Sequence, residues 1–158
     1  MISTIISDFS RVILDVKNKE YKGSLNSLYK DLLSHNRKFD FFDYFELNND
    51  ILNLLTTLRN KYSINVFTTG TIQRAPEISE IIKPIFDNVL VAEELGLDKK
   101  VSDSYIKIAE ILDKSTDDIF YIDDQAENIK AAKTAGLVTF LYADFKERSY
   151  RIAVELHR

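Results

Sequence analysis

The sequence contains no cysteine, and it has only two histidines, two prolines and four glycines. The absence of cysteine excludes disulfides, thiolate nucleophiles and zinc sites built from cysteine. Because His35 and His157 are the only histidines, we do not expect a histidine-built metal site or a catalytic triad. Any chemistry that this chain performs must therefore rest on carboxylates, hydroxyls, amides and basic side chains.

Long apolar runs and an excess of basic residues are also missing. No stretch approaches the roughly 18 apolar residues of a membrane span, and no signal segment opens the chain. The formal net charge of −4 argues against nonspecific nucleic-acid binding, which needs a basic face. We therefore expect a protein that binds neither membranes nor nucleic acid, with a cytoplasmic location as the default.

The remaining composition is that of a globular protein. With 158 residues, of which 45% are hydrophobic and 29% charged, the chain is long enough to bury roughly 70% of its unfolded surface. It has no repeat and no low-complexity linker. We expect one domain that spans residues 1–158.

Short apolar runs, rich in β-branched and aromatic residues, predict strands that are buried on both faces. These runs are residues 4–7, 64–67, 89–91, 119–122 and 138–142. Helical periodicity lies between them, at residues 51–62, at 101–112 with Ser102 as N-cap, and at 126–133 before Gly136. The alternation predicts an α/β fold, a Rossmann-like three-layer αβα sandwich around a parallel sheet.

One interval is too long for a simple connection. Within residues 17–49, the stretch 24–34 has a helical pattern, and 39–45 contains five aromatic residues. We interpret 17–49 as a very small helical and aromatic cap insertion over the carboxyl edge of the sheet. The tail, 143–158, predicts a final helix.

Polar residues end several of the predicted strands. Asp8 ends the first, Thr68, Thr69 and Gly70 the second, and Asp123 and Asp124 the fourth, while Lys99 and Lys100 precede the helix before the fourth. Ligands of parallel sheets bind at this edge. Carboxylates there suit Mg²⁺, and a hydroxyl, amides and an ammonium suit a phosphoryl group.

Each element also has an ordinary structural explanation. Asp8 alone could end a turn or cap a helix, and Asp124 with Glu127 fits a capping box. Lys99 and Lys100 would normally lie in a solvated loop, and aromatic residues such as those at 39–45 usually pack inside a protein. The order and spacing of the whole set favour the chemical interpretation.

That order resembles the four signature motifs of the haloacid dehalogenase-like hydrolase superfamily, over nearly the whole chain. The stretch FYIDDQAENIKAAKTAGLVTFLY, residues 120–142, carries most of the resemblance. VFTTGT is similar to the second motif and KKVSDSYIKIAEIL to the third, although the third lacks the usual proline. An aromatic residue often follows the motif lysine by six positions; Tyr105 therefore favours Lys99 over Lys100, without deciding between them.

The resemblance implies a mechanism. Asp8 would attack phosphorus and form an aspartyl-phosphate, which water would hydrolyse, with Thr68 and Lys99 completing the catalytic set. Mg²⁺ would be held by Asp8, the Ser10 main-chain carbonyl and Asp124. Further roles are implied for other residues: Asp123 as another metal ligand or a supporting partner, Asn128 as the residue that orients the acidic loop, and Thr69 and Gly70 as substrate-binding positions. Arg11 would either meet a substrate anion or face solvent.

The main departure is Ser10, where phosphatases of this superfamily carry a second aspartate that serves as acid and base. A serine hydroxyl is no acid near neutral pH, so help worth roughly 10²–10⁴-fold would be missing. We therefore expect a slow Mg²⁺-dependent phosphohydrolase of small phosphorylated substrates, restricted to good leaving groups such as acyl or aryl phosphates.

Of three alternatives beside it, two remain open and one is rejected. The chain could be a catalytically weakened member that binds a phosphorylated ligand, or a protein partner or second copy through residues 39–45. A two-component receiver is rejected, because its acidic pair follows the first strand and here the pair follows the fourth. Dehalogenation needs no Mg²⁺, and the Asp123–Asp124 pair favours a metal.

Overall fold

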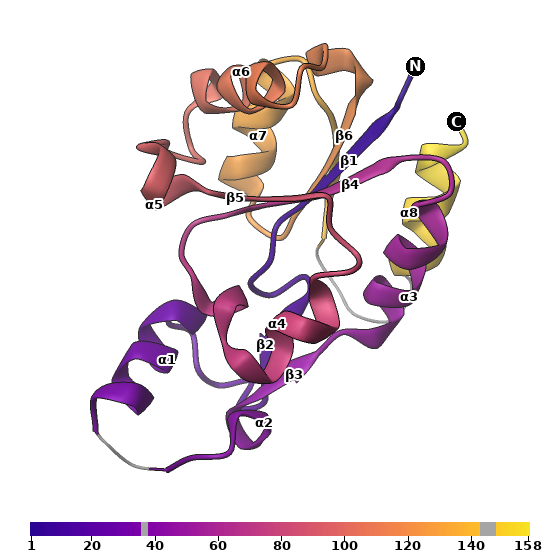
Figure 1. The fold of residues 1–158 in the computed structure, drawn as a ribbon. Helices are drawn as coiled ribbons and strands as arrows, with labels where there is room; N and C mark the ends of the chain where they lie inside the picture. The colour runs from indigo at the N-terminus through magenta and orange to yellow at the C-terminus, as the bar shows by residue number, and fades with distance from the viewer. Residues whose placement is uncertain (36–37, 143–147) are drawn as a thin grey trace.

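The computed structural model describes residues 1–35, 38–142 and 148–158. Its centre is a five-stranded sheet in the order β5-β4-β1-β6-β7, and every neighbouring pair is parallel (Figure 1). The strands are β1 (Thr4–Ser7), β4 (Ser63–Thr68), β5 (Asn88–Val91), β6 (Ile119–Asp123) and β7 (Val138–Leu141). The five predicted strands are thus confirmed. Burial on both faces, however, was wrong for the two edge strands: Val89 of β5, and Val138 and Leu141 of β7, are exposed because an edge strand has a neighbour on one side only.

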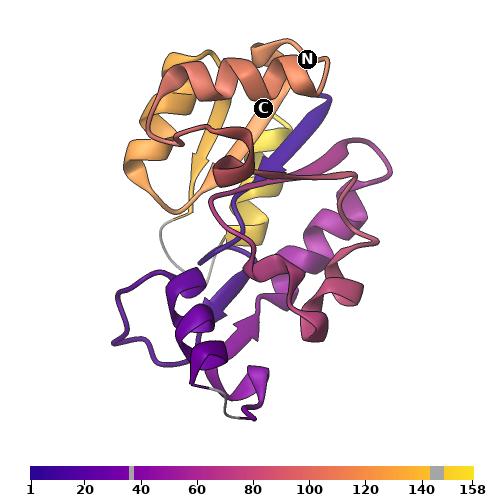
Figure 2. The same cartoon turned by 60° about the vertical axis from the view of Figure 1, so that its left-hand side comes forward.

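Helices cover both faces of this sheet (Figures 1 and 2). On one face, Ile5 of β1 packs with α3 (Asn49–Leu58), α4 (Pro76–Ile82) and α8 (Arg148–Leu156). On the other face, Ile6 packs with α6 (Ser102–Ile111) and α7 (Ala126–Thr134). Successive strand residues point to opposite faces, so both halves of the apolar run are buried. The predicted three-layer αβα sandwich is confirmed.

The interval after β1 forms its own small unit, beyond the carboxyl end of that strand (Figure 2). Two antiparallel strands, β2 (Leu14–Val16) and β3 (Phe45–Leu47), begin and end this unit, and α1 (Leu25–Ser34) and α2 (Phe41–Tyr44) lie between them in the sequence. Rings of Phe41 and Phe45 are fully buried and lie edge-on to Tyr29. The aromatic segment 39–45 therefore supplies the core of this unit, while its role as a cap stays a prediction.

Short elements complete the chain, namely the 3₁₀ turns η1 (Ile72–Arg74) and η2 (Thr116–Asp118) and the helix α5 (Ala92–Leu95). The final helix, predicted for 143–158, is present as α8, and residues 143–147 lie outside the described part of the chain. No helix in the described ranges is long and apolar enough to cross a membrane.

One detail of helix capping differs from expectation. Ser102 is the first residue of α6 and not its N-cap; Val101 holds that position without a side-chain hydrogen bond. Asp98 instead caps the turn before the helix by accepting from the Lys100 N–H, so the chain enters α6 through an extended residue. The predicted end of α7 is confirmed, since Gly136 follows it with a φ of +102°.

Candidate active site

The carboxylate of Asp8 lies at the carboxyl end of the central strand and is almost fully buried. Its main-chain N–H donates to the Ile122 carbonyl of β6 at 2.8 Å, which continues the sheet by one residue. Asp8 Oδ1 accepts from the Phe9 N–H and from Lys99 Nζ, both at 2.8 Å. The sheet thus anchors the main chain of Asp8, while the Phe9 N–H and the Lys99 ammonium hold its carboxylate.

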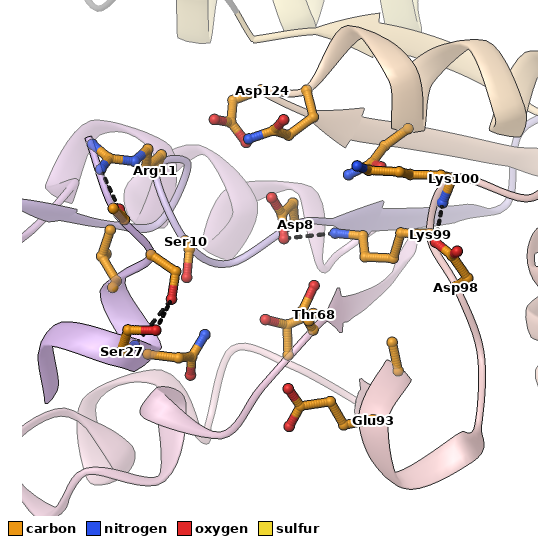
Figure 3. Close-up of a pocket in the computed structure, with 18 of the residues that line it drawn as sticks. Asp8, Ser10, Arg11, Ser27, Thr68, Glu93, Asp98, Lys99, Lys100 and Asp124 are labelled. Atoms are coloured by element: carbon orange, nitrogen blue, oxygen red, sulfur yellow. Dashed lines mark hydrogen bonds and ion pairs between the residues drawn. The ribbon is translucent and has the colours of Figure 1, made fainter. Parts of the chain in front are cut away.

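Lys99 is the lysine that reaches Asp8 (Figure 3). Its side chain is 6% exposed, and Nζ lies 2.8 Å from Asp8 Oδ1 and 3.0 Å from Asp123 Oδ2. Burial alone would lower the pKa of Lys99, but the charges of Asp8 and Asp123 outweigh it and raise that pKa. Lys100 points elsewhere, because its exposed ammonium pairs with Glu127 at 3.2 Å.

Asp123 is fully buried, and both of its carboxylate oxygens are engaged. Oδ2 accepts from the Tyr121 hydroxyl and from Asn128 Nδ2 at 3.1 Å, in addition to Lys99. Oδ1 accepts from the Gln125 N–H at 2.8 Å. The contact with Asn128 agrees with the predicted role of that residue in orienting the acidic loop.

Asp124 completes a group of three carboxylates. One oxygen from each of Asp8, Asp123 and Asp124 lies within 4.8 Å of the others. Burial, together with the charges of Asp8 and Asp123, raises the pKa of Asp124 to about 8. Three carboxylates facing one ammonium leave an excess of negative charge, and such an oxygen-rich donor set fits a hard divalent cation such as Mg²⁺.

A cleft of about 550 Å³ opens over Asp8. Thr68 lies buried at the end of β4 and faces it from below Asp8 in the view of Figure 3. Thr69, Ser10 and Arg11 also line the cleft, and so do Asp124 and Asn128. The structure therefore gathers most of the predicted site residues around one space.

Among known families, the sequence profile of the haloacid dehalogenase-like hydrolases matches residues 9–136. This chain belongs to that family. No curated protein sequence resembles the chain closely enough to count as a match. The match spans most of the chain and ends at Gly136, the glycine that follows α7.

Solved structures of this haloacid dehalogenase-like fold superpose on nearly the whole chain. A family enzyme from Bacteroides thetaiotaomicron, in complex with magnesium and inorganic phosphate, has a TM-score of 0.73 at 13% identity and covers 96% of this chain and 99% of its own. The 2-haloacid dehalogenase from Pseudomonas syringae has a TM-score of 0.69 at 13% identity, with 100% and 99% covered. At this identity the likeness shows the fold alone.

Arg11 and Gly70 were expected near the substrate, but in this haloacid dehalogenase-like protein both contact other residues of the chain. The Arg11 guanidinium donates to the main-chain carbonyls of Tyr21 and Gly23, at 3.1 and 2.8 Å, and lies 3.4 Å from Asp15. Arg11 therefore ties the insertion loop to the segment after Asp8, although it lines the cleft. Gly70 does not line the cleft; it packs against the side chain of Asn26.

Asn26 is a residue of the site that the sequence did not suggest. Its Oδ1 accepts from the Ile72 N–H at 2.9 Å, across 46 residues of chain. A Cβ on Gly70 would lie 2.6 Å from that oxygen. An asparagine in an amphipathic helix carries no sequence signal for such a contact, so only the fold reveals that α1 is fastened to the loop after β4.

Ser10 occupies the position of the usual second aspartate. Its hydroxyl oxygen is buried and has no hydrogen-bond partner among the described residues. The side chain lies beside the cleft, so nothing in its surroundings converts it into a proton donor with the strength of a carboxylic acid.

Proposed function

We propose that the protein is a Mg²⁺-dependent phosphohydrolase that acts through an aspartyl-phosphate at Asp8. The observation that carries the proposal is the buried bridge of Lys99 between Asp8 and Asp123, next to Asp124, at the base of an open cleft. An anionic nucleophile with an adjacent ammonium and an acidic cation site is suited to phosphoryl transfer, in which charge spreads over the phosphate oxygens.

The cation would be held by Asp8, the Ser10 main-chain carbonyl and Asp124, and when bound it would neutralise charge on the phosphoryl oxygens. Asp123 is assigned a supporting role, because its oxygens already accept from Lys99, Asn128, Tyr121 and Gln125. It holds Lys99 against Asp8 instead of offering a free oxygen.

The remaining steps use side chains around the cleft. The Asp8 carboxylate attacks phosphorus and the P–O bond to the leaving group breaks, so the phosphoryl group becomes bound to Asp8. The Thr68 hydroxyl donates to a phosphoryl oxygen, and Lys99 stabilises the charge that develops there. Thr69, which also lines the cleft, supplies a further donor, and water then releases phosphate and restores Asp8.

Protonation of the leaving group is the step for which this chain lacks a suitable residue. With Ser10 in place of the acid, an alcohol would have to depart as an alkoxide, which is a poor leaving group. Acyl and aryl phosphates release weak bases and need little protonation. We therefore propose that the protein hydrolyses activated phosphates and turns over alkyl phosphates slowly.

The test is Mg²⁺-dependent hydrolysis of acetyl phosphate and p-nitrophenyl phosphate by the wild-type protein and by Asp8→Asn. We expect Asp8→Asn to lose turnover by several orders of magnitude, because it removes the nucleophile. Asp87→Asn, which changes a carboxylate remote from the cleft, serves as the control and should retain wild-type rates. Equal rates for wild type and Asp8→Asn would reject the proposal for these substrates.

A weakened, ligand-binding member is the second candidate, favoured by Ser10 and by the exposure of Phe42 and Tyr44, 39% each. It predicts Mg²⁺-dependent phosphate binding without turnover of either substrate. A partner or second copy would bind to the aromatic segment 39–45, and Phe42→Ser would then weaken that association. Chloride release from a 2-haloacid, measured without Mg²⁺, distinguishes the dehalogenase alternative.

A further inference from the structure

Two buried tyrosine hydroxyls contact Asp123 and Lys99 of the site. Tyr105 and Tyr121 are both fully buried, with ring centroids 5.1 Å apart. The Tyr121 hydroxyl donates to Asp123 Oδ2. The Tyr105 hydroxyl donates to the main-chain carbonyl of Lys99 at 2.6 Å and lies 3.5 Å from the Tyr121 hydroxyl.

Packing alone does not explain these hydroxyls. Both rings sit in the apolar cluster between the sheet and α6, next to Phe67 and Ile108, where phenylalanine would supply the same ring. A buried hydroxyl costs free energy unless it is hydrogen-bonded. Here both hydroxyls find their partners on Asp123 and Lys99, the two residues that bear on Asp8.

The sheet explains why Tyr121 reaches Asp123. The two residues are separated by one position on β6, so their side chains point to the same face. That face also receives Lys99 from the turn before α6. Burial raises the pKa of the Tyr121 hydroxyl, and the Asp123 charge raises it further, so the hydroxyl remains a protonated donor.

We propose that Tyr121 is a positioning residue that fixes Asp123, and through it the ammonium of Lys99, against Asp8. Tyr105 holds the main chain of Lys99 from the other side. For its catalytic consequence the proposal rests on the proposed phosphohydrolase function; for the geometry of Lys99 it does not. It adds to the site a residue that touches neither substrate nor cation.

The specific consequence follows from the bonds of Asp123. Without the Tyr121 hydroxyl, Asp123 Oδ2 keeps Lys99 and Asn128 but loses the donor beneath it. The carboxylate gains freedom to rotate, and the ammonium moves with it. In the described structure that hydroxyl donates to Asp123 and not to Asp8 or Asp124, so we expect the affinity for Mg²⁺ to stay nearly unchanged.

The first experiment compares Tyr121→Phe with Tyr62→Phe, the same change in a buried tyrosine of the cluster on the opposite face of the sheet. With p-nitrophenyl phosphate we expect Tyr121→Phe to lower kcat about tenfold and the Mg²⁺ concentration for half-maximal rate to change less than about twofold. Tyr62→Phe should leave both unchanged. A wild-type kcat in Tyr121→Phe would overturn the proposal.

A double-mutant cycle separates positioning from a general loss of structure. Tyr121→Phe is repeated in a Lys99→Met background, and the readout is the affinity for orthovanadate in the presence of Mg²⁺. With Lys99 present, we expect loss of the Tyr121 hydroxyl to weaken the affinity for orthovanadate about tenfold. In the Lys99→Met background, we expect it to leave that affinity unchanged. Equal losses in both backgrounds, or no vanadate binding by the wild-type protein, would contradict the positioning role.

Vanadate binding also separates the two proposals. If the wild-type protein binds vanadate but hydrolyses neither acetyl phosphate nor p-nitrophenyl phosphate, the phosphohydrolase proposal fails, and the cycle still measures whether Tyr121 acts through Lys99.

Discussion

The floor and the outer wall of the cleft differ in how their charged side chains are held, since those of the floor are buried and those of the wall are exposed. At the floor, Asp8, Lys99 and Asp123 are buried and bonded to one another. On the wall, contributed by the insertion, Lys22 and Lys30 are exposed, and the ammonium of Lys22 donates to the main-chain carbonyl of Lys19. The buried charged groups are anchored at the edge of the sheet and in the turn before α6, whereas the exposed ammonium groups belong to the small insertion.

The largest effect is expected from breaking the ion pairs of the floor. Lys99→Met leaves the carboxylates of Asp8 and Asp123 buried without their cation, which costs about 3–5 kcal/mol of unfolding free energy. Lys30→Met, the same change on the wall, should stay within about 0.5 kcal/mol. Urea unfolding of both variants checks the contrast; equal costs would show that the floor is no more tightly built than the wall.

Restoring an acid at the boundary between the two regions has the next largest effect. Ser10→Asp supplies the carboxyl group that the leaving oxygen of an alkyl phosphate lacks, and we expect its turnover to rise about 10²-fold. Turnover of acetyl phosphate should change little. Ser10→Asn is the matched control, since it adds similar bulk without an acid. No gain in Ser10→Asp would place the loss elsewhere than in acid catalysis.

The junction between the regions is tested at Gly70. In Gly70→Ala the new methyl group would lie 2.6 Å from Asn26 Oδ1, so the Asn26 side chain or α1 must shift, at a cost of about 1–3 kcal/mol. The same substitution in an Asn26→Ala background should cost less, because the clashing side chain is gone. Thermal unfolding of the four proteins measures this coupling. Additive losses would mean that the two residues do not meet.

The smallest effect concerns an exposed pair at the amino end of the sheet. Arg59 lies 3.1 Å from Asp87, whose carboxylate also accepts from Ser63 and the Ile64 N–H. Burial would raise the pKa of Asp87, but these hydrogen bonds and the Arg59 charge outweigh it and lower that pKa. The resulting stability is present above about pH 4, the unfolded pKa, and is lost as the pH falls through the lower folded pKa.

Asp87→Asn should therefore cost only about 0.5 kcal/mol at neutral pH, because water screens a pair that is more than a third exposed. The difference from wild type should shrink as the pH falls from about 4 through the lowered pKa of folded Asp87, below which Asp87 is protonated in both states. Urea unfolding across this pH range checks it. A loss that persists in acid would mean that the carboxylate charge is not its source.

Local patterns predicted much of this molecule. Buried apolar runs predicted the strands, and the residue that ends each strand predicted which carboxylates and hydroxyls meet. Capping was predicted less well. Serine is a favoured N-cap residue, yet Ser102 is the first residue of α6 and Val101 holds the N-cap position after the turn at Asp98. Sequence propensity does not show how the chain enters a helix.

Distant contacts were beyond the sequence. The spacing to Tyr105 favoured Lys99 over Lys100 without deciding between these neighbours, and only the fold turns Lys99 inward to Asp8 and leaves Lys100 with Glu127. Tyr121 looked like an ordinary strand residue, and Asn26 like an ordinary helix residue. Their partners lie on other elements or on the same face of a strand, where hydrogen bonding depends on three-dimensional placement.

The sequence by itself determined the fold class and the candidate nucleophile, because apolar periodicity and strand ends are local properties of the chain. It also determined that Ser10 replaces the usual acid. The tertiary structure alone decided that Asp123 is saturated by four donors, that Arg11 binds the insertion loop, and that Asn26 covers Gly70. Each of those outcomes depends on which groups satisfy a buried or partly buried polar atom, and burial exists only once the chain has folded.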